Sequence, residues 1–361
     1  MTAARAGRAF RMLLALVCAS ACTDAKPVQD VQPWPELDAL FRQDTRWLGG
    51  DGAYSCDLGH NRVLWLFGDS LIARDASGNR DTAYFIRNSA AIQTGYDPAR
   101  AFLAFSWGQT DGHPGSFIAE RGDRWFWPGA CVRAGAGLLI FGQWLRQTSP
   151  GQWGFTSVDS ASLFIANPDA DPGDWQPSDT AAPSFGSDPI FGTAAGLTAD
   201  QLFVYGNRGA SHDYVLARYS RAAAAIGDLT HPDYRTSGSW CTPGSSGSCT
   251  PSSIFSDGAP ESSVHLDANR QIWLMFQTEG FGATTLAYRT ASAPEGPWSA
   301  PISFYRPPAS FDENAFVYAG KAHPEIAGGG LAVSYVPSRF SDDPRPSPAD
   351  FYFPHFVRVS L

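Results

Sequence analysis

The sequence predicts an all-β fold, a five-bladed β-propeller of four-stranded antiparallel blades, and three observations support this. Five apolar runs end in an aromatic residue at positions 67, 141, 205, 276 and 335, so a β unit recurs about every 60 to 75 residues. Each run follows a turn rich in Gly, Asp or Asn, which is typical of a β-hairpin. A short segment before each turn predicts one more strand. A repeating unit of this size is typical of a propeller blade.

The strands of each blade follow in order along the chain. The second strands are the apolar runs at 64–68, 138–142, 202–206, 273–277 and 332–336. Third strands are expected at 83–93, 161–166, 214–219, 284–290 and 351–360, and outer strands at 101–107, near 175, near 254 and at 298–304. The fifth repeat lacks an outer strand. Because a propeller must protect its sheet edges, we expect residues 38–47 to supply that strand and close the ring.

Composition agrees with many short strands and excludes one class of partner. The chain has 36 Gly and 27 Pro, which punctuate strands, and 12 Trp with 24 Phe, which are bulky partners across strands. Only residues 218–229 have a helical pattern, and Gly227 ends it. The 35 acidic residues outnumber the 26 basic residues, so nucleic acid is not an expected partner. An acidic, aromatic-rich surface favours neutral or cationic sugars.

The N-terminal residues predict export. Arg5, Arg8 and Arg11 precede an apolar run at 12–18, which is too short to span a bilayer and is typical of a signal peptide. We therefore assign 1–21 to a signal peptide, 22–36 to a polar tether and 37–361 to a single propeller domain.

Residues 19–22, Ala-Ser-Ala-Cys, are similar to a bacterial lipobox, with Ala19 where Leu is usual. They predict lipidation at Cys22 and contact with a membrane through that anchor. The same residues suit an ordinary signal peptidase, so simple secretion is the alternative. The expected location is therefore the cell envelope, at the outer membrane or cell surface, or the medium outside the cell.

Export permits disulfide bonds. Cys241 and Cys249 bracket a Gly/Ser loop at 242–248 and are expected to pair. Cys56 and Cys131 fall at matching places in the first two repeats. They either pair or are simply small buried residues, and we favour the second interpretation. No C-x-x-C spacing occurs, so a zinc site is not expected.

No cofactor is expected, and the alternative left open is a structural calcium ion in the central funnel. Asp169, Asp171 and Asp174 imitate a calcium loop, but Pro168 and the Pro-Gly pair at 172–173 favour a solvated turn. We expect the protein to be a monomer.

A propeller brings residues that are distant in sequence to one funnel. The start of each inner strand and the end of each second strand face the same side of the ring. The inner-strand starts are expected at Asp51, Trp127 with Pro128, 188–192, Glu261 and 323–325. The second-strand ends are expected to contribute Asp69, 143–144, 207–208 and Glu279. Carboxyl groups gathered at low dielectric shift one another's pKa values, which is the usual condition for acid–base chemistry.

These segments resemble a known family. Residues 47–55 read WLGGDGAYS and residues 64–70 read LWLFGDS, and together they resemble the opening of bacterial five-bladed propellers classed as domains of unknown function. Some relatives of that group are endo-D-arabinanases, and the architecture is similar to the furanosidase propellers. Segments 87–89, 127–130, 261–263, 277–282 and 321–325 strengthen the resemblance, which covers most of 45–360.

The resemblance implies three catalytic residues. It implies Asp51 as base or nucleophile, Glu261 as general acid and Asp188 as the residue that tunes their pKa values. Such chemistry needs one protonated and one ionised carboxyl on either side of the scissile bond. Other interpretations are a tight turn for Asp51 and a charge at a strand edge for Glu261. Asp188 precedes Pro189, which is also common in plain turns.

The remaining candidates are assigned to substrate binding. They are Asp69, Arg87, Asn88, Trp127, Arg208, Glu279, His323 and Glu325. Alternatives stay open for four of these residues. His323 and Glu325 alternate on one strand and could satisfy each other in the core. Arg87 could pair with Asp69 without a ligand, and Trp127 could stack on a sugar or pack between blades.

The sequence therefore predicts a secreted, lipid-anchored glycoside hydrolase that acts on an extracellular or cell-wall polysaccharide, with furanosides such as arabinan preferred. The alternative from another class is a non-catalytic, glycan-binding propeller. A lyase or transferase on the same scaffold is a third option, because propellers host many chemistries.

Overall fold

The computed structural model describes residues 28–151, 153–209, 211–244, 249–340, 345 and 348–361. The expected signal peptide (1–21) and the lipidation site Cys22 lie outside these residues. In the described part the chain is all-β apart from two short α-helices and three 3-10 helices. No described helix is long and apolar enough to cross a membrane.

Five antiparallel sheets of four or five strands make up most of the molecule. The first contains β3 (Tyr54–Gly59), β4 (Arg62–Phe67), β7 (Ser89–Thr94) and β8 (Phe102–Ser106). The second contains β11 (Arg124–Ala134), β12 (Gly137–Gln147), β13 (Phe155–Ile165) and β14 (Ser178–Asp179). The third contains β15 (Ile190–Leu197), β16 (Gln201–Asn207), β17 (Tyr214–Ser220), β18 (Asp233–Arg235) and β19 (Trp240–Cys241).

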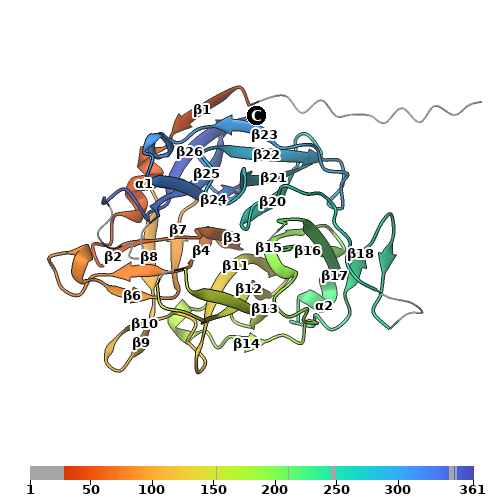
Figure 1. Cartoon of the computed structure of the whole chain (residues 1–361), viewed down its shortest axis with the longest axis horizontal. Helices are drawn as coiled ribbons and strands as arrows, with labels where there is room; N and C mark the ends of the chain where they lie inside the picture. The colour runs from red at the N-terminus through yellow and green to blue at the C-terminus, as the bar shows by residue number, and fades with distance from the viewer. Residues whose placement is uncertain (1–27, 152, 210, 245–248, 341–344, 346–347) are drawn as a thin grey trace, which may run out of the picture.

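The last two large sheets follow the same pattern. The fourth contains β20 (Ser262–Asp267), β21 (Ile272–Thr278), β22 (Leu286–Ala291) and β23 (Ile302–Tyr305). The fifth contains β24 (Ala315–His323), β25 (Leu331–Arg339), β26 (His355–Ser360) and β1 (Asp30–Pro33). Figure 1 shows the five sheets around a common centre, with β3, β11, β15, β20 and β24 nearest to it. The fold is therefore propeller-like.

The smaller elements decorate this arrangement. A three-stranded sheet contains β2 (Trp47–Gly50), β5 (Ser70–Ile72) and β6 (Tyr84–Ile86), and a hairpin contains β9 (Gly108–Thr110) and β10 (His113–Gly115). The helices are α1 (Pro35–Phe41), α2 (Arg221–Ala224) and the 3-10 turns Arg80–Thr82, Pro172–Asp174 and Pro308–Phe311.

The outer strand of the fifth sheet comes from a different segment than expected. β1 pairs with β26 in antiparallel register, from Asp30 opposite Ser360 to Pro33 opposite Val357. Residues 38–47 do not form this strand, because Pro35 starts helix α1. Leu37, Leu40 and Phe41 follow at helical spacing, and all three are buried in the core.

The same finding corrects the tether assigned to 22–36. Its described part, from residue 28, is folded: it contains β1, the buried Trp34 and the start of α1. The indole of Trp34 packs in a hydrophobic cluster with residues of the first and fifth sheets, so this segment is part of the domain.

Three other expectations changed in detail. The strand expected at 83–93 is divided into β6 and β7, which belong to different sheets. The helical pattern at 218–229 yields only the four residues of α2, because 214–220 is strand β17. Instead of an outer strand near 254, the third sheet uses β18 and β19.

Two disulfides join the described cysteines. The expected Cys241–Cys249 bond is confirmed. Cys56 and Cys131 also form a disulfide, which corrects the preference for two unpaired residues. The bond links β3 to β11, the inner strands of neighbouring sheets, because both cysteines lie at equivalent positions facing the shared interface.

Candidate active site

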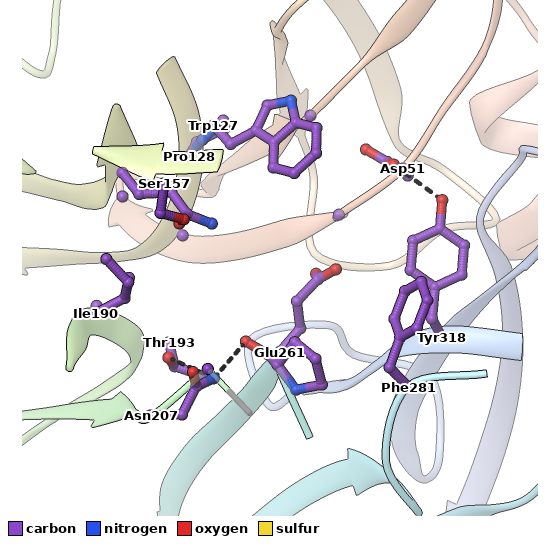
Figure 2. A pocket seen from close by; sticks show the side chains of 18 of the residues that line it. Asp51, Trp127, Pro128, Ser157, Ile190, Thr193, Asn207, Glu261, Phe281 and Tyr318 are labelled. Carbon is purple, nitrogen blue, oxygen red and sulfur yellow. Dashed lines mark hydrogen bonds between the residues drawn. The ribbon is translucent and has the colours of Figure 1, made fainter. Parts of the chain in front are cut away.

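A cavity of about 410 Å³ lies where the five inner strands begin. Its lining contains three carboxyl side chains, from Asp51, Asp69 and Glu261, and no lysine or arginine. We call it the carboxylate cavity. Figure 2 shows the carboxyl group of Glu261 pointing into the space between Trp127 and Asp51. Side chains that are more than 200 residues apart in sequence thus share one site.

Asp51 lies in the bend between β2 and β3. Gly49 and Gly52 take φ values of 138° and 81°, a region that favours glycine. A Cβ atom on Gly68 would lie 2.3 Å from Asp51 Oδ1, so a side chain at position 68 would displace this carboxyl. The Gly-Gly-Asp-Gly sequence and Gly68 together leave room for the side chain of Asp51 just before β3.

Two tyrosine hydroxyls contact one oxygen of Asp51. Tyr318 donates to Asp51 Oδ2 at 2.9 Å and Tyr352 donates to the same atom at 3.3 Å. Burial raises the pKa of Asp51 well above its ordinary value, and the negative charges of Asp69 and Glu261 add to this increase. The bond from Tyr318 and the charge of Lys321 oppose it. Asp51 therefore tends to hold a proton.

Asp69 follows β4 and is held by two donors. Trp127 Nε1 donates to Asp69 Oδ1 at 2.8 Å, and Arg87 lies 3.4 Å from Asp69 Oδ2. Burial raises the pKa of Asp69 to about 6, against the lowering effect of Arg87 and Trp127. The guanidinium of Arg87 also lies 4.2 Å above the ring of Trp125. Arg87 therefore pairs with Asp69, the alternative that the sequence left open.

Glu261 precedes β20 and pairs with a buried lysine. Lys321 Nζ lies 2.5 Å from Glu261 Oε2, and the lysine side chain is only 1% exposed. Burial lowers the pKa of Lys321, and the charge of Glu261 opposes that shift. The carboxyl of Glu261 thus has a cationic partner that Asp51 lacks among the described residues.

Aromatic rings form one wall of the carboxylate cavity. Trp153 and Phe281 are each 45% exposed, and their ring centroids lie 5.9 Å apart. Phe316 lies 6.2 Å from Trp153 and 5.4 Å from Phe281. Trp127 and Phe155 contact each other edge-on at 4.8 Å on another side. Exposed rings beside carboxyl groups suit the flat faces of sugars.

Seven expected site residues lie outside the cavity lining: Asp188, Arg208, Glu279, Asn88, Arg87, His323 and Glu325. The carboxyl of Asp188 is 54% exposed and lies 4.0 Å from Arg208, whose guanidinium also donates to Pro251. Glu279 is exposed and accepts a hydrogen bond from Ser303. Asp188 therefore lies apart from the pair that it was expected to tune.

Asn88 is a structural residue. Its side-chain amide donates to the carbonyls of Ile118 and Phe126 at 3.1 and 2.9 Å. Its Oδ1 accepts from the backbone N–H of Ile118 at 2.6 Å. The side chain is 1% exposed, and these backbone groups use both of its N–H donors and one acceptor position of its oxygen, so Asn88 holds backbone segments together.

His323 and Glu325 lie at the opposite end of the inner strands. β24 begins at Ala315, so His323 is its last residue and not its first. The imidazole is fully buried between Ser55 and Ser334, at 2.6 and 2.8 Å. Burial lowers the pKa of His323 well below its ordinary value. This corrects the placement of 323–325 at an inner-strand start.

These two residues line a second cavity, of about 380 Å³, which we call the rear cavity. It also contains the Cys56–Cys131 disulfide and His265. Burial raises the pKa of Glu325 to about 7 and lowers the pKa of His265 to about 4. No group of three or more potential metal ligands occurs among the described residues.

The three residues that hold the two carboxyl groups were not assigned from the sequence. Tyr318 and Tyr352 hold Asp51, and Lys321 holds Glu261. Lys321 lies in segment 321–325, of which only His323 and Glu325 were assigned. Tyr318 could have been found only from the true start of β24, which places it beside the carboxylate cavity.

Comparison with known proteins gave one family and several structures. A family model described as "Domain of unknown function (DUF5005)" matches residues 35–361. No curated protein matches the chain. A crystal structure from Bacteroides ovatus ATCC 8483, provisionally named a hydrolase, has a TM-score of 0.69 and 18% sequence identity, over 91% of this chain and 90% of that chain. This similarity shows a shared fold.

Two further structures match at lower scores. The GH43_1 enzyme from Xanthomonas citri, solved with xylose, has a TM-score of 0.45 and 11% identity over 91% of this chain and 93% of that chain. The exo-beta-1,3-galactanase from Phanerochaete chrysosporium, solved with beta-1,3-galactotriose, has a TM-score of 0.45 and 10% identity. That match covers 86% of this chain and 60% of the galactanase chain.

Proposed function

Because the chain belongs to the family described as a domain of unknown function (DUF5005), its activity has to be argued from its site, and we propose that it is a glycoside hydrolase. The observation that carries the proposal is that Asp51 and Glu261 line the same cavity and have different partners, a neutral hydroxyl for Asp51 and an ammonium for Glu261. Hydrolysis of a glycosidic bond requires one protonated and one ionised carboxyl. Two hydroxyls hold Asp51, and a buried ammonium holds Glu261.

The cavity supports a neutral sugar as substrate. Its lining contains no lysine or arginine, so the cavity offers no such cation to bind the negative charge of a uronic acid or a sulfated sugar. Its size lies within the about 300 to 1,000 Å³ of small-ligand sites. We propose a furanoside such as arabinan, a preference that rests on the resemblance of segments 47–55 and 64–70.

The proposal also covers the architecture and the location of the enzyme. We propose a closed ring of five blades, supported by contacts between the first and last inner strands, where Ser55 bonds His323 and the backbone of Gly52 accepts from Lys321. We also propose export, with a lipid anchor at Cys22, so that a monomeric domain faces polysaccharide outside the cell. Labelling with a radioactive fatty acid, lost in Cys22→Ala, tests the anchor.

The experiment on function measures products released from arabinans, arabinogalactan and fructans. Wild type is compared with Glu261→Gln and Asp51→Asn, and with Glu279→Gln as a matched control outside the cavity. We expect one polymer to be cleaved, each site variant to lose at least about 1,000-fold in rate, and the control to keep full rate. If wild type cleaves no polymer, or a site variant keeps its rate, the proposal fails.

A second candidate function is glycan binding without catalysis. The exposed rings of Trp153 and Phe281 at the cavity mouth favour it, because aromatic rings bind sugars without any carboxyl chemistry. Retention of one polymer by wild type and Glu261→Gln alike, with no product from either, would support this candidate and exclude hydrolysis.

A further inference from the structure

We propose that Lys321 is the positioning residue that sets the charges of the site: it holds Glu261 as the carboxylate, so that Glu261 is the base or nucleophile and Asp51 is the proton donor. The inference rests on the proposed function. It reverses the roles that the resemblance implies for the two carboxyl groups.

The contacts of Lys321 identify it as an ammonium. Its Nζ lies 2.6 Å from the carbonyl oxygen of Gly52, 3.2 Å from that of Ala319 and 2.5 Å from Glu261 Oε2. Three acceptors match the three N–H donors of a charged lysine, whereas a neutral amine has only two. The Nζ atom also lies 4.2 Å from the centre of the Tyr54 ring, a contact that favours a cation.

One irregularity in β24 positions both carboxyl partners. The register of β24 against β25 shifts between Tyr318 and Lys321, and Ala319 takes a φ of 59°. A Cβ on Gly320 would lie 2.8 Å from the backbone of Gln277, so the bulge lies against β21. From this bulge Tyr318 reaches Asp51 and Lys321 reaches Glu261.

A count of charges assigns the proton. Three carboxyl groups, of Asp51, Asp69 and Glu261, line the cavity. Two cations lie in ion pairs with them: Arg87 with Asp69 and Lys321 with Glu261. Among the side chains that the structure describes, Asp51 is hydrogen-bonded only by the neutral hydroxyls of Tyr318 and Tyr352. The third carboxyl therefore takes a proton, since an uncompensated buried charge is costly.

The titratable groups that face Asp51 come from every neighbouring element. They are Tyr54 on β3, Asp69 after β4, Glu261 before β20, Tyr318 and Lys321 on β24, and Tyr352 before β26. Burial and the two carboxylates raise the pKa of Asp51, in agreement with the charge count. Because Oδ2 accepts both tyrosine bonds, the proton belongs on Oδ1.

The reaction then balances as follows. Asp51 gives its proton to the glycosidic oxygen, which keeps the electron pair of the breaking bond to the anomeric carbon. On the other side Glu261 takes a proton from the attacking water, or attacks the anomeric carbon itself and is released by water afterwards. In both cases one water is consumed and two hydroxyl groups form. When Glu261 is the base, it then releases the proton to solvent and Asp51 takes one up from solvent. When Glu261 is the nucleophile, Asp51 takes its proton back from the water that releases the sugar.

The first test uses leaving groups. Phenyl and 2,4-dinitrophenyl arabinofuranosides are compared, because only the phenyl glycoside needs a proton donor. We expect Asp51→Asn to lose at least about 100-fold on the phenyl substrate and less than about 10-fold on the dinitrophenyl substrate. Glu261→Gln should lose at least about 100-fold on both. The opposite pattern for the two variants would overturn the assignment.

Lys321 is tested by the same assay and by its conservative variant. Lys321→Met should lower kcat about 10-fold or more with little change in KM and move the pH optimum, and Lys321→Arg should restore part of the rate. A purely structural role would leave the pH profile of Lys321→Met unchanged, and that result would contradict the proposal.

The second test needs no substrate, so it separates this inference from the proposed function. In a Glu325→Gln background, which removes the other carboxyl whose pKa lies near neutral pH, infrared difference spectra near neutral pH should show a protonated carboxyl band that disappears in Asp51→Asn and persists in Glu261→Gln. In Lys321→Met a new protonated band, absent from the double variant with Glu261→Gln, should appear. A band lost in Glu261→Gln instead would overturn the inference, whether or not any glycoside is cleaved.

Discussion

The two cavities at opposite ends of the inner strands contain similar residues with different roles. Each contains a half-buried carboxyl with a raised pKa, Asp51 in the carboxylate cavity and Glu325 in the rear cavity. In the carboxylate cavity every carboxyl has a donor or a cation beside exposed aromatic rings. In the rear cavity a disulfide and a serine-bound His323 fasten neighbouring strands.

Residue type alone therefore does not identify a functional site. A histidine and a glutamate on one strand have the composition of an acid–base pair, yet His323 is fully buried and bonded on both ring nitrogens. The carboxylate cavity is distinguished by side chains that remain accessible and by partners that divide the charges unequally. We therefore expect changes at the rear cavity to affect stability and changes at the carboxylate cavity to affect rate.

The largest effect on this comparison is expected from the rear disulfide. The Cys56→Ala/Cys131→Ala variant should lower the free energy of unfolding by about 4 kcal/mol, because the bond closes a long loop, with a sequence separation of 75. The Cys241→Ala/Cys249→Ala variant, with a separation of 8, should lose about 2.5 kcal/mol. Guanidinium unfolding measures both values. If the catalytic rate per folded molecule fell in the Cys56→Ala/Cys131→Ala variant, the rear cavity would affect catalysis as well as stability, which would contradict the division of roles between the two cavities.

At a fixed pH, His323 offers the next largest effect. His323→Leu keeps the volume but leaves the hydroxyls of Ser55 and Ser334 without their partner, so the free energy of unfolding should fall by about 2 kcal/mol. The matched control is His265→Leu, because His265 Nδ1 is buried and has no hydrogen-bond partner in the described part of the chain. The control should cost less. Equal losses in urea unfolding would show that the serine contacts contribute nothing.

Features that depend on neighbours in the sequence could be predicted, and features that depend on distant contacts could not. The repeat of apolar runs and turns predicts the strands, because a hairpin is a local feature. Asp51 and Glu261 were placed at inner-strand starts because the strand follows within a few residues. β24 was misplaced, because its bulge at Ala319 and its aromatic residues hide where it begins.

The remaining errors concern partners that lie far apart in sequence. Asn88 has the chemistry of a ligand amide, and only the carbonyl of Phe126 shows that it is structural. Lys321 cannot be paired with Glu261 from sequence, since 60 residues separate them. The matching positions of Cys56 and Cys131 in two repeats allow a disulfide, but the sequence does not show that the two strands lie within bonding distance.

Trp127 tests the carboxylate cavity with a smaller change. Trp127→Phe keeps a ring but removes the N–H that donates to Asp69. The pKa of Asp69, about 6 in the wild type, should rise, and kcat/KM should fall about 10-fold, or about 1.4 kcal/mol. Carbon-13 NMR titration follows the carboxyl. Trp125→Phe is the control, since its indole N–H has no partner among the described residues.

Glu325 is expected to change how stability depends on pH. Its pKa is raised from 4.5 to about 7, so the folded protein holds this proton in a window where the unfolded chain has lost it. Stability is therefore lost as pH rises through that window. Glu325→Gln should flatten the curve by about 3 kcal/mol between its two ends. Thermal unfolding at several pH values measures this, and parallel curves for variant and wild type would contradict it.

The most direct measurement of the central claim is a crystal structure of the Glu261→Gln variant with the oligosaccharide that wild type releases from the polymer panel. We expect a sugar in the carboxylate cavity, with its glycosidic oxygen toward Asp51, its anomeric carbon toward position 261 and a ring face against Trp127. A sugar bound in the rear cavity, or one whose glycosidic oxygen faces position 261 and not Asp51, would contradict the account.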